Sequence, residues 1–338
     1  MSQTLSAQQL GAAHSRLKDT LLQFFEGGLP DATRKSFELQ LAQFQQQPSA
    51  LFAAQSFLRQ STDKYVLWYS ASLLEKRASE KWSTVPPQQK QQIRNTLMTA
   101  VVAHSNKDNA WPRMVLDKAL AALCTIALQD FPENYPSYFG DLYKLSASGA
   151  TNTVGMRLLR FTLEEFPLSP DNSHAHTGGR RRRVKLASER VRKLSTTMGP
   201  VTAKFLPVLK KTLETGSCDD AAALDALQSL ERISAAVPDV VGTYMGSTST
   251  LLKLLFSYLI PRRDSSTTAD TNIAVTARAP GALRVLAAIV GQQQIKSSSE
   301  QAFTLFVAKQ VGWCCVGSAH VYFETTGFHR SVFSLTCC

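Results

Sequence analysis

The segment YVLWYSASLLEKRASEKW, residues 65–82, decides the fold, because it has the period of a helix and carries apolar residues on more than one side. At 100° per residue, one face of this helix is uniformly apolar; its members are Leu67, Ala71, Leu74 and Ala78. A second face lies about a quarter turn away and mixes an aromatic ring with polar groups; its members are Trp68, Ser72, Glu75 and Ser79. This pattern is typical of a helix stack in which each helix contacts several neighbours, with the second face left for recognition.

Similar helical stripes recur along the chain, and prolines or capping residues separate them. The stripes include Phe37, Leu41 and Phe44; Ile93, Leu97 and Val101; Val115, Ala119, Ala122 and Ile126; and Ala222, Leu224, Leu227, Leu230 and Ile233. Pro48, Pro132 and Pro238 lie where such stripes end, and Asp63 offers an N-cap for the helix quoted above. One helix–turn–helix unit takes roughly 40 residues, which is the period of HEAT repeats. The sequence therefore predicts an all-α fold, a HEAT-like helical-repeat α-solenoid of about seven repeats.

Length and composition narrow the class of protein. The chain has 338 residues, of which 44% are hydrophobic, and this is enough to bury a substantial core. No stretch approaches the roughly 18 apolar residues of a membrane-spanning helix, so we expect no membrane insertion. The first residues, MSQTLSAQQLGAAH, lack the basic start and apolar block of a secretory signal. We therefore expect an intracellular, reducing environment.

The formal net charge of +11 favours acidic partners without choosing among them. The strongest basic run is RRRRVK, and the basic residues of this patch are Arg180, Arg181, Arg182, Arg183 and Lys185. It has three interpretations: a solvated loop and helix start, a contact with an acidic partner, or a phosphate-binding or nuclear-localisation-like stripe. No aromatic residues interleave with the run, and no nucleic-acid-binding signature is present, so we do not expect a nucleic-acid partner. A nucleic-acid binder would instead show salt-sensitive binding that depends on these arginines.

Nothing in the sequence predicts an enzyme, a metal site or a cofactor. None of the six histidines lies in a GxSxG, HExxH or P-loop context. The six cysteines form no CxxC pair and show no zinc spacing with histidine. Cys124 and Cys218 are expected to be small core residues.

Four segments, in order, resemble conserved parts of the exportins, which belong to the importin-β superfamily. They are TRKSFELQL (33–41), similar to the first helix of the family; residues 65–82, similar to the next conserved helix with its terminal tryptophan; QDFPENYPSYF (129–139), similar to the signature Q-[DE]-W-P-x-x-[WY]-P; and LRFTLEE (159–165), similar to an apolar run that ends in two glutamates. Phe131 stands where the signature usually has tryptophan. Each segment alone is weak, whereas the ordered set is specific, and a weaker resemblance continues to about Gln310.

The resemblance implies a nuclear transport receptor that shuttles between nucleus and cytoplasm. Exportins bind the GTP form of the small GTPase Ran together with protein cargo, contact nucleoporins, and release their cargo after GTP hydrolysis in the cytoplasm. Within the family, the resemblance points to the branch whose cargo is actin bound to profilin. Ran-GTP and cargo each favour the same curvature of the superhelix, so each raises the affinity for the other. The alternative is a helical-repeat scaffold that binds other proteins without Ran.

The resemblance also implies which residues contact Ran. The positions of this chain that match contacts on inner-face helices are Glu75, Lys76, Glu164 and Glu165. Lys76 departs from the family, which usually has asparagine there. Trp68 is a further candidate that comes from the helical wheel. The structural alternatives are that Trp68 only packs against the preceding helix and that the glutamates lie at solvated helix ends.

The resemblance divides the chain into three regions. Residues 1–110 correspond to an importin-β-type N-terminal Ran-binding region. Residues 111–310 correspond to exportin-like HEAT repeats, with loops at 167–180 and 261–281. Residues 311–338 have no helical period and hold four of the six cysteines, so we expect an atypical tail that is not a repeat. We also expect the chain to be a truncated form that stops short of a full receptor.

Overall fold

A computed structural model gives the structure of the chain; it describes residues 5–26, 28, 30–105, 109–168, 188–215, 221–237, 319–326 and 330–337, with isolated positions between 240 and 285. The basic patch at 180–185 and almost all of the predicted loops at 167–180 and 261–281 lie outside the described residues. The chain forms two compact units. The first unit contains residues 1–165 and 179–186, and the second contains residues 166–178 and 187–338. The boundaries expected at residues 110 and 310 stay predictions.

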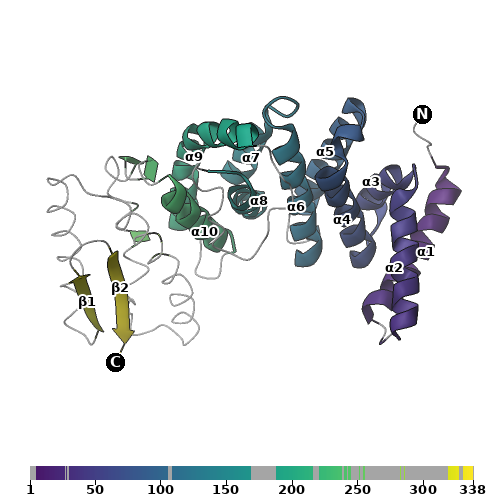
Figure 1. Ribbon diagram of the computed structural model, residues 1–338, viewed down its shortest axis with the longest axis horizontal. Helices are drawn as coiled ribbons and strands as arrows, with labels where there is room; N and C mark the ends of the chain where they lie inside the picture. The colour runs from purple at the N-terminus through teal and green to yellow at the C-terminus, as the bar shows by residue number, and fades with distance from the viewer. Residues whose placement is uncertain are drawn as a thin grey trace. The chain divides into compact units, whose positions relative to one another are not determined.

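The first unit is built from helices joined by short connections (Figure 1). They are α1 (Ala7–Glu26), α2 (Asp31–Gln46), α3 (Ala50–Gln60), α4 (Lys64–Glu80), the short 3-10 helix η1 (Trp82–Thr84), α5 (Pro87–Ala103), α6 (Arg113–Asp130), α7 (Tyr138–Ala147) and α8 (Asn152–Glu165). The second unit contains α9 (Ser188–Thr215), which packs against α10 (Ala221–Ala236), and the strands β1 (Ala319–Thr326) and β2 (Arg330–Cys337).

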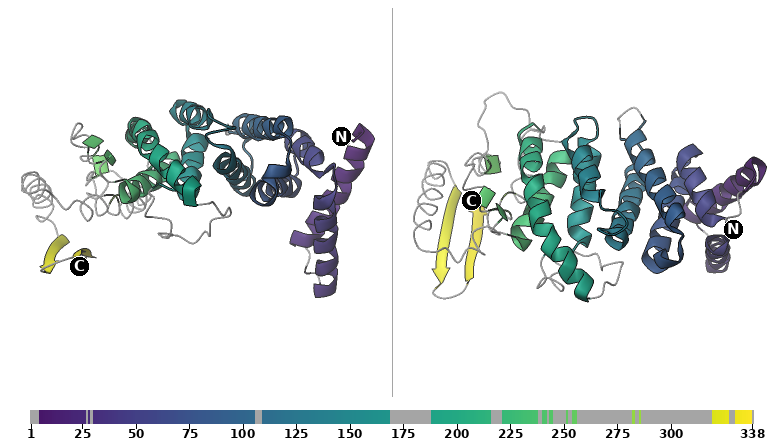
Figure 2. Two further views of the ribbon diagram at one scale, coloured as in Figure 1. Left: turned by 45° about the horizontal axis from the view of Figure 1, so that its top comes forward. Right: turned by 90° about the horizontal axis from the view of Figure 1, so that it is seen from above.

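Consecutive helices of the first unit form antiparallel pairs that stack on one another (Figures 1 and 2). α3 packs against α4, α5 against α6, and α7 against α8. The second helices of these pairs, α4, α6 and α8, lie side by side in one layer, and α3 contacts α5 in the other. This two-layer stack of helix pairs is the HEAT-like repeat that the sequence predicts, so the all-α helical-repeat prediction is confirmed for this unit.

The helix ends follow from identifiable residues. The Asp63 carboxylate accepts hydrogen bonds of 3.0 Å from the backbone N–H groups of Tyr65 and Val66, so it caps α4 as expected. Pro87 occupies the first turn of α5, where its missing N–H is not needed. α2 ends just before Pro48, and α10 ends just before Val237 and Pro238. The local sequence therefore sets where each repeat turns.

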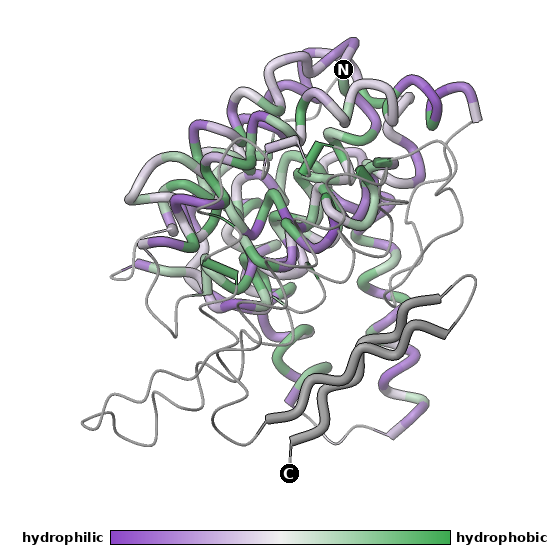
Figure 3. The backbone as a smooth tube through the Cα atoms, turned by 90° about the vertical axis from the view of Figure 1, so that its left-hand side faces the viewer, coloured by the Kyte–Doolittle hydropathy of each residue, from purple (hydrophilic) through white to green (hydrophobic). Residues whose placement is uncertain are grey.

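The core lies between the two layers, and α6 contributes more buried residues to it than any other described helix. Twelve of the 18 residues of α6 are buried, because α4, α5 and α8 all pack on it. Cys124 is among them, as predicted for a core cysteine. Hydrophilic and hydrophobic stretches alternate along the helical tubes in Figure 3, as expected of helices with one side in a core. Within the described residues, none of the helices combines the length and apolar character needed to cross a bilayer.

The tail contains an antiparallel hairpin that the sequence does not predict. β1 pairs with β2 in a register that places Phe323 opposite Phe333. The hairpin lies within residues 311–338, which lack the helical period of the repeats.

Candidate partner-binding groove on helices α4 and α6

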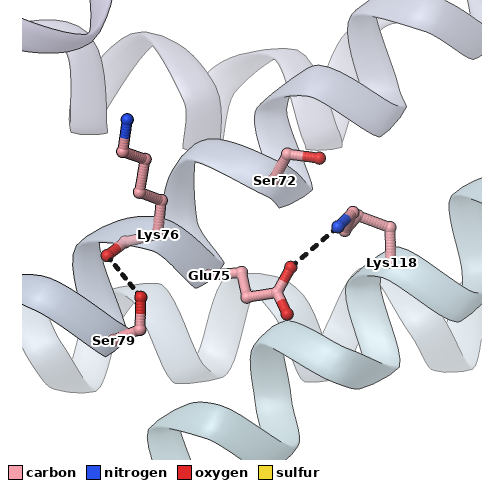
Figure 4. A pocket seen from close by; sticks show the side chains of 5 residues that line it. All are labelled: Ser72, Glu75, Lys76, Ser79 and Lys118. Atoms are coloured by element: carbon pink, nitrogen blue, oxygen red, sulfur yellow. Dashed lines mark hydrogen bonds and ion pairs between the residues drawn. The ribbon is translucent and has the colours of Figure 1, made fainter. Parts of the chain in front are cut away.

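The segment quoted first contributes most of the residues around an open, shallow depression with a volume of about 510 Å³ (Figure 4). Its lining residues are Ser72, Glu75, Lys76 and Ser79 of α4 and Lys118 of α6. The α4 members recur every three or four residues, so they share the side of α4 that borders α6. We refer to this depression as the α4–α6 groove.

Glu75 and Lys118 form an ion pair between the two helices that build the groove. The distance from Lys118 Nζ to Glu75 Oε2 is 2.9 Å, and Glu75 is only 5% exposed. Lys118 Nζ also lies 5.4 Å from the centre of the Trp68 ring, within the range of a cation–π contact. We expected Glu75 to lie on an exposed recognition surface. This prediction is wrong, because Glu75 is buried. Its carboxylate instead holds Lys118 in place between α4 and α6.

Lys76 presents a positive charge at the edge of the groove. Its side chain is exposed and extends away from the Glu75–Lys118 pair in Figure 4. Its ammonium donates a 3.0 Å hydrogen bond to Gln45 Oε1 at the end of α2. The hydroxyl of Ser79 donates a 3.0 Å hydrogen bond to the Lys76 carbonyl. Lys76 is therefore oriented by α2 and accessible to a partner.

Trp68 lies half-buried beside the groove and belongs to an aromatic cluster. Its ring meets Phe25 of α1 edge-on, with 5.5 Å between ring centres. Phe25 in turn stacks on Tyr65 at 5.0 Å and is 42% exposed. Trp68 thus packs against α1, three helices earlier in the chain, whereas the structural alternative named the helix directly before it.

Glu164 and Glu165 lie at the end of α8 and do not line the α4–α6 groove. Glu164 is half-buried, with one oxygen 3.9 Å from Arg160 Nη1. Glu165 is buried, so the alternative of a solvated helix end is wrong for this residue. Burial raises the pKa of the nearby Cys124 thiol well above its usual value, and the Glu165 carboxylate raises this pKa further. The structure therefore brings Trp68, Glu75 and Lys76 together and leaves the α8 glutamates apart.

Lys118 is the groove residue that the sequence analysis missed. It follows Asp117 in the sequence, next to the long apolar stretch of α6, and these two adjacent charges are the signal that could have revealed it. Charges in such a helix need partners on neighbouring helices. Lys118 pairs with Glu75 of α4, and Asp117 accepts a 3.2 Å hydrogen bond from Arg157 of α8.

The signature segment at 129–136 fixes the corner next to the groove helices. Asp130, 1% exposed, accepts a 2.8 Å hydrogen bond from the Trp82 indole and another of 2.8 Å from Arg94 Nη1. The Arg94 guanidinium also lies 4.8 Å from the centre of the Tyr135 ring. The acidic and aromatic positions of the signature therefore join the end of α6 to α5 and to the turn after α4.

The groove offers charge and hydrogen-bonding groups for a protein surface. Two described histidines have structural contacts: His14 shares a 2.9 Å hydrogen bond with Ser61, and His104 stacks on Trp111. Among the described residues, no group of three or more His, Cys, Asp or Glu side chains is placed to hold a metal ion. The arrangement thus suits recognition of a partner that presents acidic and apolar groups.

The α4 side of this groove lies within a segment that matches a known domain. Residues 37–103 match the importin-beta N-terminal domain. The match spans most of α2 and all of α3, α4 and α5, so it includes four of the five groove residues.

The chain is also similar to several exportins. It is 29% identical to Exportin-6-A of Xenopus laevis over 150 residues, which cover 44% of this chain and 13% of that relative. It is 28% identical to human Exportin-6 over 150 residues, with the same coverage, and 26% identical to Exportin-1 of Schizosaccharomyces pombe over 149 residues, which cover 42% of this chain and 14% of the relative. The matched part is thus about an eighth of the length of these relatives. The chain therefore carries an importin-beta N-terminal domain at residues 37–103 and is related in sequence to the N-terminal part of the exportins.

Proposed function

We propose that this chain acts in nuclear export by binding Ran-GTP through its N-terminal repeats. The observation that carries the proposal is that four of the five residues of the α4–α6 groove lie on α4, within the residues that match the importin-beta N-terminal domain. The resemblance to exportins supports shuttling between nucleus and cytoplasm, with nucleoporin contacts during passage. Actin bound to profilin is the cargo that we propose to test first.

The groove supports distinct roles for its residues. Lys76 is exposed, so it contacts an acidic side chain of the GTPase directly. Glu75 is buried, so it acts by holding Lys118 at the groove wall. Trp68 offers the edge of a half-buried ring next to Lys118. Glu164 and Glu165 belong to α8, and a partner that extends along the layer from the groove would reach this helix second.

A pulldown with Ran in two nucleotide states tests the proposal. The full chain is incubated with Ran loaded with a non-hydrolysable GTP analogue or with GDP. We expect at least about tenfold tighter binding of the GTP form, which corresponds to about 1.4 kcal/mol of discrimination. Adding actin–profilin should then raise the affinity for Ran-GTP, because coupling between two ligands is reciprocal.

Charge-reversal variants locate the contact. Lys76→Glu should weaken the binding of Ran-GTP about tenfold or more, because it replaces an attractive pair with a repulsive one. Lys144→Glu is the matched control, since Lys144 is also an exposed helical lysine and does not line the groove. If the folded chain binds both nucleotide states equally, the proposal is wrong.

The second candidate is a helical-repeat scaffold that binds proteins without Ran. The observation that favours it is the exposed ring of Phe25, the member of the aromatic cluster that lies outside the residues that match the importin-beta N-terminal domain. A scaffold would retain its protein partners whether or not Ran-GTP is present.

A further inference from the structure

The positive charge of this chain is concentrated in one stretch. Residues 180–215 contain eleven basic and two acidic side chains, a net charge of +9, whereas the whole chain carries +11. Helix α9 is the described part of this stretch; it has six basic and two acidic residues, a net charge of +4. The attraction of the chain for anions is therefore centred on this region.

Three exposed lysines of α9 form a line along the helix; they are Lys193, Lys204 and Lys211. On an ideal helix, separations of 11 and 7 residues bring the three side chains within about 20° of one another around the axis; Pro200 and Pro207 lie inside α9, one in each interval. Along the axis the gaps are about 16 Å and about 10 Å. We refer to these residues as the lysine stripe. Beside it, Lys210 forms an ion pair of 3.6 Å with Glu214, one of the two acidic residues of the helix.

The opposite side of α9 is already occupied by the core. Its buried apolar residues are Leu194, Met198, Phe205, Leu206, Val208, Leu209 and Leu213. α9 packs against α10, whose buried side includes Leu227 and Leu230. An amphipathic helix that binds a membrane inserts its apolar face into the lipid. Because this face is buried in protein, the stripe does not act as part of a membrane-inserting helix.

The stripe also lacks the features of a nucleic-acid site. Proteins that bind single strands stack bases on aromatic rings, and the one aromatic residue of α9, Phe205, is buried. Lysine ammonium groups act as separate point charges without the two-pronged geometry of arginine. These properties favour a partner with separate anionic side chains.

We propose that the lysine stripe of α9 binds an extended acidic segment of a partner protein. An extended chain advances about 3.3–3.6 Å per residue, so the two gaps correspond to about five and about three residues. The segment would therefore place carboxylates at about positions 1, 6 and 9. This interaction does not depend on Ran or on the export function.

Fluorescence anisotropy with the full chain tests the proposal. The probe is a labelled peptide of about ten consecutive glutamates, long enough to span the stripe. The variant with Lys193→Glu, Lys204→Glu and Lys211→Glu should bind the peptide about tenfold more weakly at about 0.1 M salt. The control carries Lys18→Glu, Lys35→Glu and Lys144→Glu, three exposed lysines of the first unit. It makes the same change in net charge and should weaken binding less than about twofold.

The outcomes separate a specific surface from general charge. Equal weakening in both triple variants would overturn the proposal, because net charge alone would then explain binding. Failure of the wild-type chain to bind the peptide would also overturn it. An oligothymidine of equal charge is the second probe, and tighter, stripe-dependent binding of this probe would assign the stripe to nucleic acid instead. Circular dichroism verifies folding, and a triple glutamine variant replaces the glutamate variant if the latter is unfolded.

Discussion

Charged side chains are used differently in the layer formed by α4, α6 and α8 and in helix α9. In the layer, charges of opposite sign pair across helices: Glu75 with Lys118, and Asp117 with Arg157. In α9, Lys210 pairs with a residue of its own helix, while the exposed stripe carries charge of one sign. Buried cross-helix pairs fix how neighbouring helices sit against each other, since a misplaced partner would leave a buried charge uncompensated. Exposed charges of one sign contribute little to folding, and they create an electrostatic potential that attracts a partner of opposite charge.

Breaking the most buried charge network should have the largest effect on stability. Asp130→Ala removes the carboxylate that accepts hydrogen bonds from Trp82 and Arg94. Their N–H groups then lose this acceptor at a buried corner. We expect a loss of about 3–5 kcal/mol in the free energy of unfolding, the usual result of breaking a buried pair. Urea denaturation followed by circular dichroism measures this loss.

The control for this variant is Glu38→Ala. Glu38 lies 3.8 Å from Arg34, and both side chains are more than half exposed. Its loss should change the free energy of unfolding by less than about 1 kcal/mol. Similar losses for both variants would contradict the distinction between buried and exposed charges.

The contact between α7 and α8 should give the next largest effect. A Cβ added at Gly155 would lie 2.5 Å from the backbone nitrogen of Ser146, so the two helices have to separate. Gly155→Ala should therefore reduce the free energy of unfolding by about 1–3 kcal/mol. Gly140→Ala is the matched variant in α7, since nothing lies within 4 Å of the added atom. It should stabilise the helix by about 0.5–1 kcal/mol, and urea midpoints that move in the same direction for both would refute the steric explanation.

Much of the first unit follows from sequence patterns. Asp63 at the start of α4 and Pro87 at the start of α5 are local signals, because a cap or a fixed dihedral acts within a few residues. The period of apolar residues is also a local signal. It gives each helix an apolar face, and burying these faces on neighbouring helices produces the two-layer stack. The two strands at 319–326 and 330–337 were not predicted. Their sequence lacks a helical period, and it also lacks the clear alternation of apolar and polar residues that indicates a strand.

The candidate groove was only partly predictable. The helical wheel placed Ser72, Glu75 and Ser79 on one face, and all three line the groove. It did not predict that Glu75 is buried, because the partner responsible, Lys118, lies 43 residues later in the chain. Glu164 and Glu165 were named as Ran contacts by resemblance, and they lie at the end of α8, away from the groove. A single helix thus determines which residues share a face, whereas exposure depends on the neighbouring helix.

Alkaline pH should lower the free energy of unfolding of the first unit. The expected loss per tyrosine is smaller than the loss expected for Asp130→Ala. Burial raises the pKa of Tyr69 and of Tyr135 to about 12, and it raises the pKa of Tyr138 well above its usual value. In the unfolded chain these phenols ionise near pH 10, so the folded state binds more protons between about pH 10 and 12. Stability is therefore complete below about pH 10 and falls as pH rises through about 12. At about pH 11 we expect a loss of about 1 kcal/mol per tyrosine, and Tyr69→Phe should remove one such contribution from urea midpoints measured across this range.

Lys204→Ala should have the smallest effect and gives the sharpest comparison between the two regions. Lys204 is exposed in the interior of α9, and alanine is a better helix former, so the free energy of unfolding should change by less than about 0.5 kcal/mol. Lys118→Ala also removes one lysine from a helix, yet it leaves the Glu75 carboxylate without the ammonium that lies 2.9 Å away. That variant should cost several times more, because a buried carboxylate loses the cation that compensates it. If the urea midpoints of the two variants are equal, burial does not distinguish these lysines. The assignment of Lys204 to partner binding and of Lys118 to packing is then wrong.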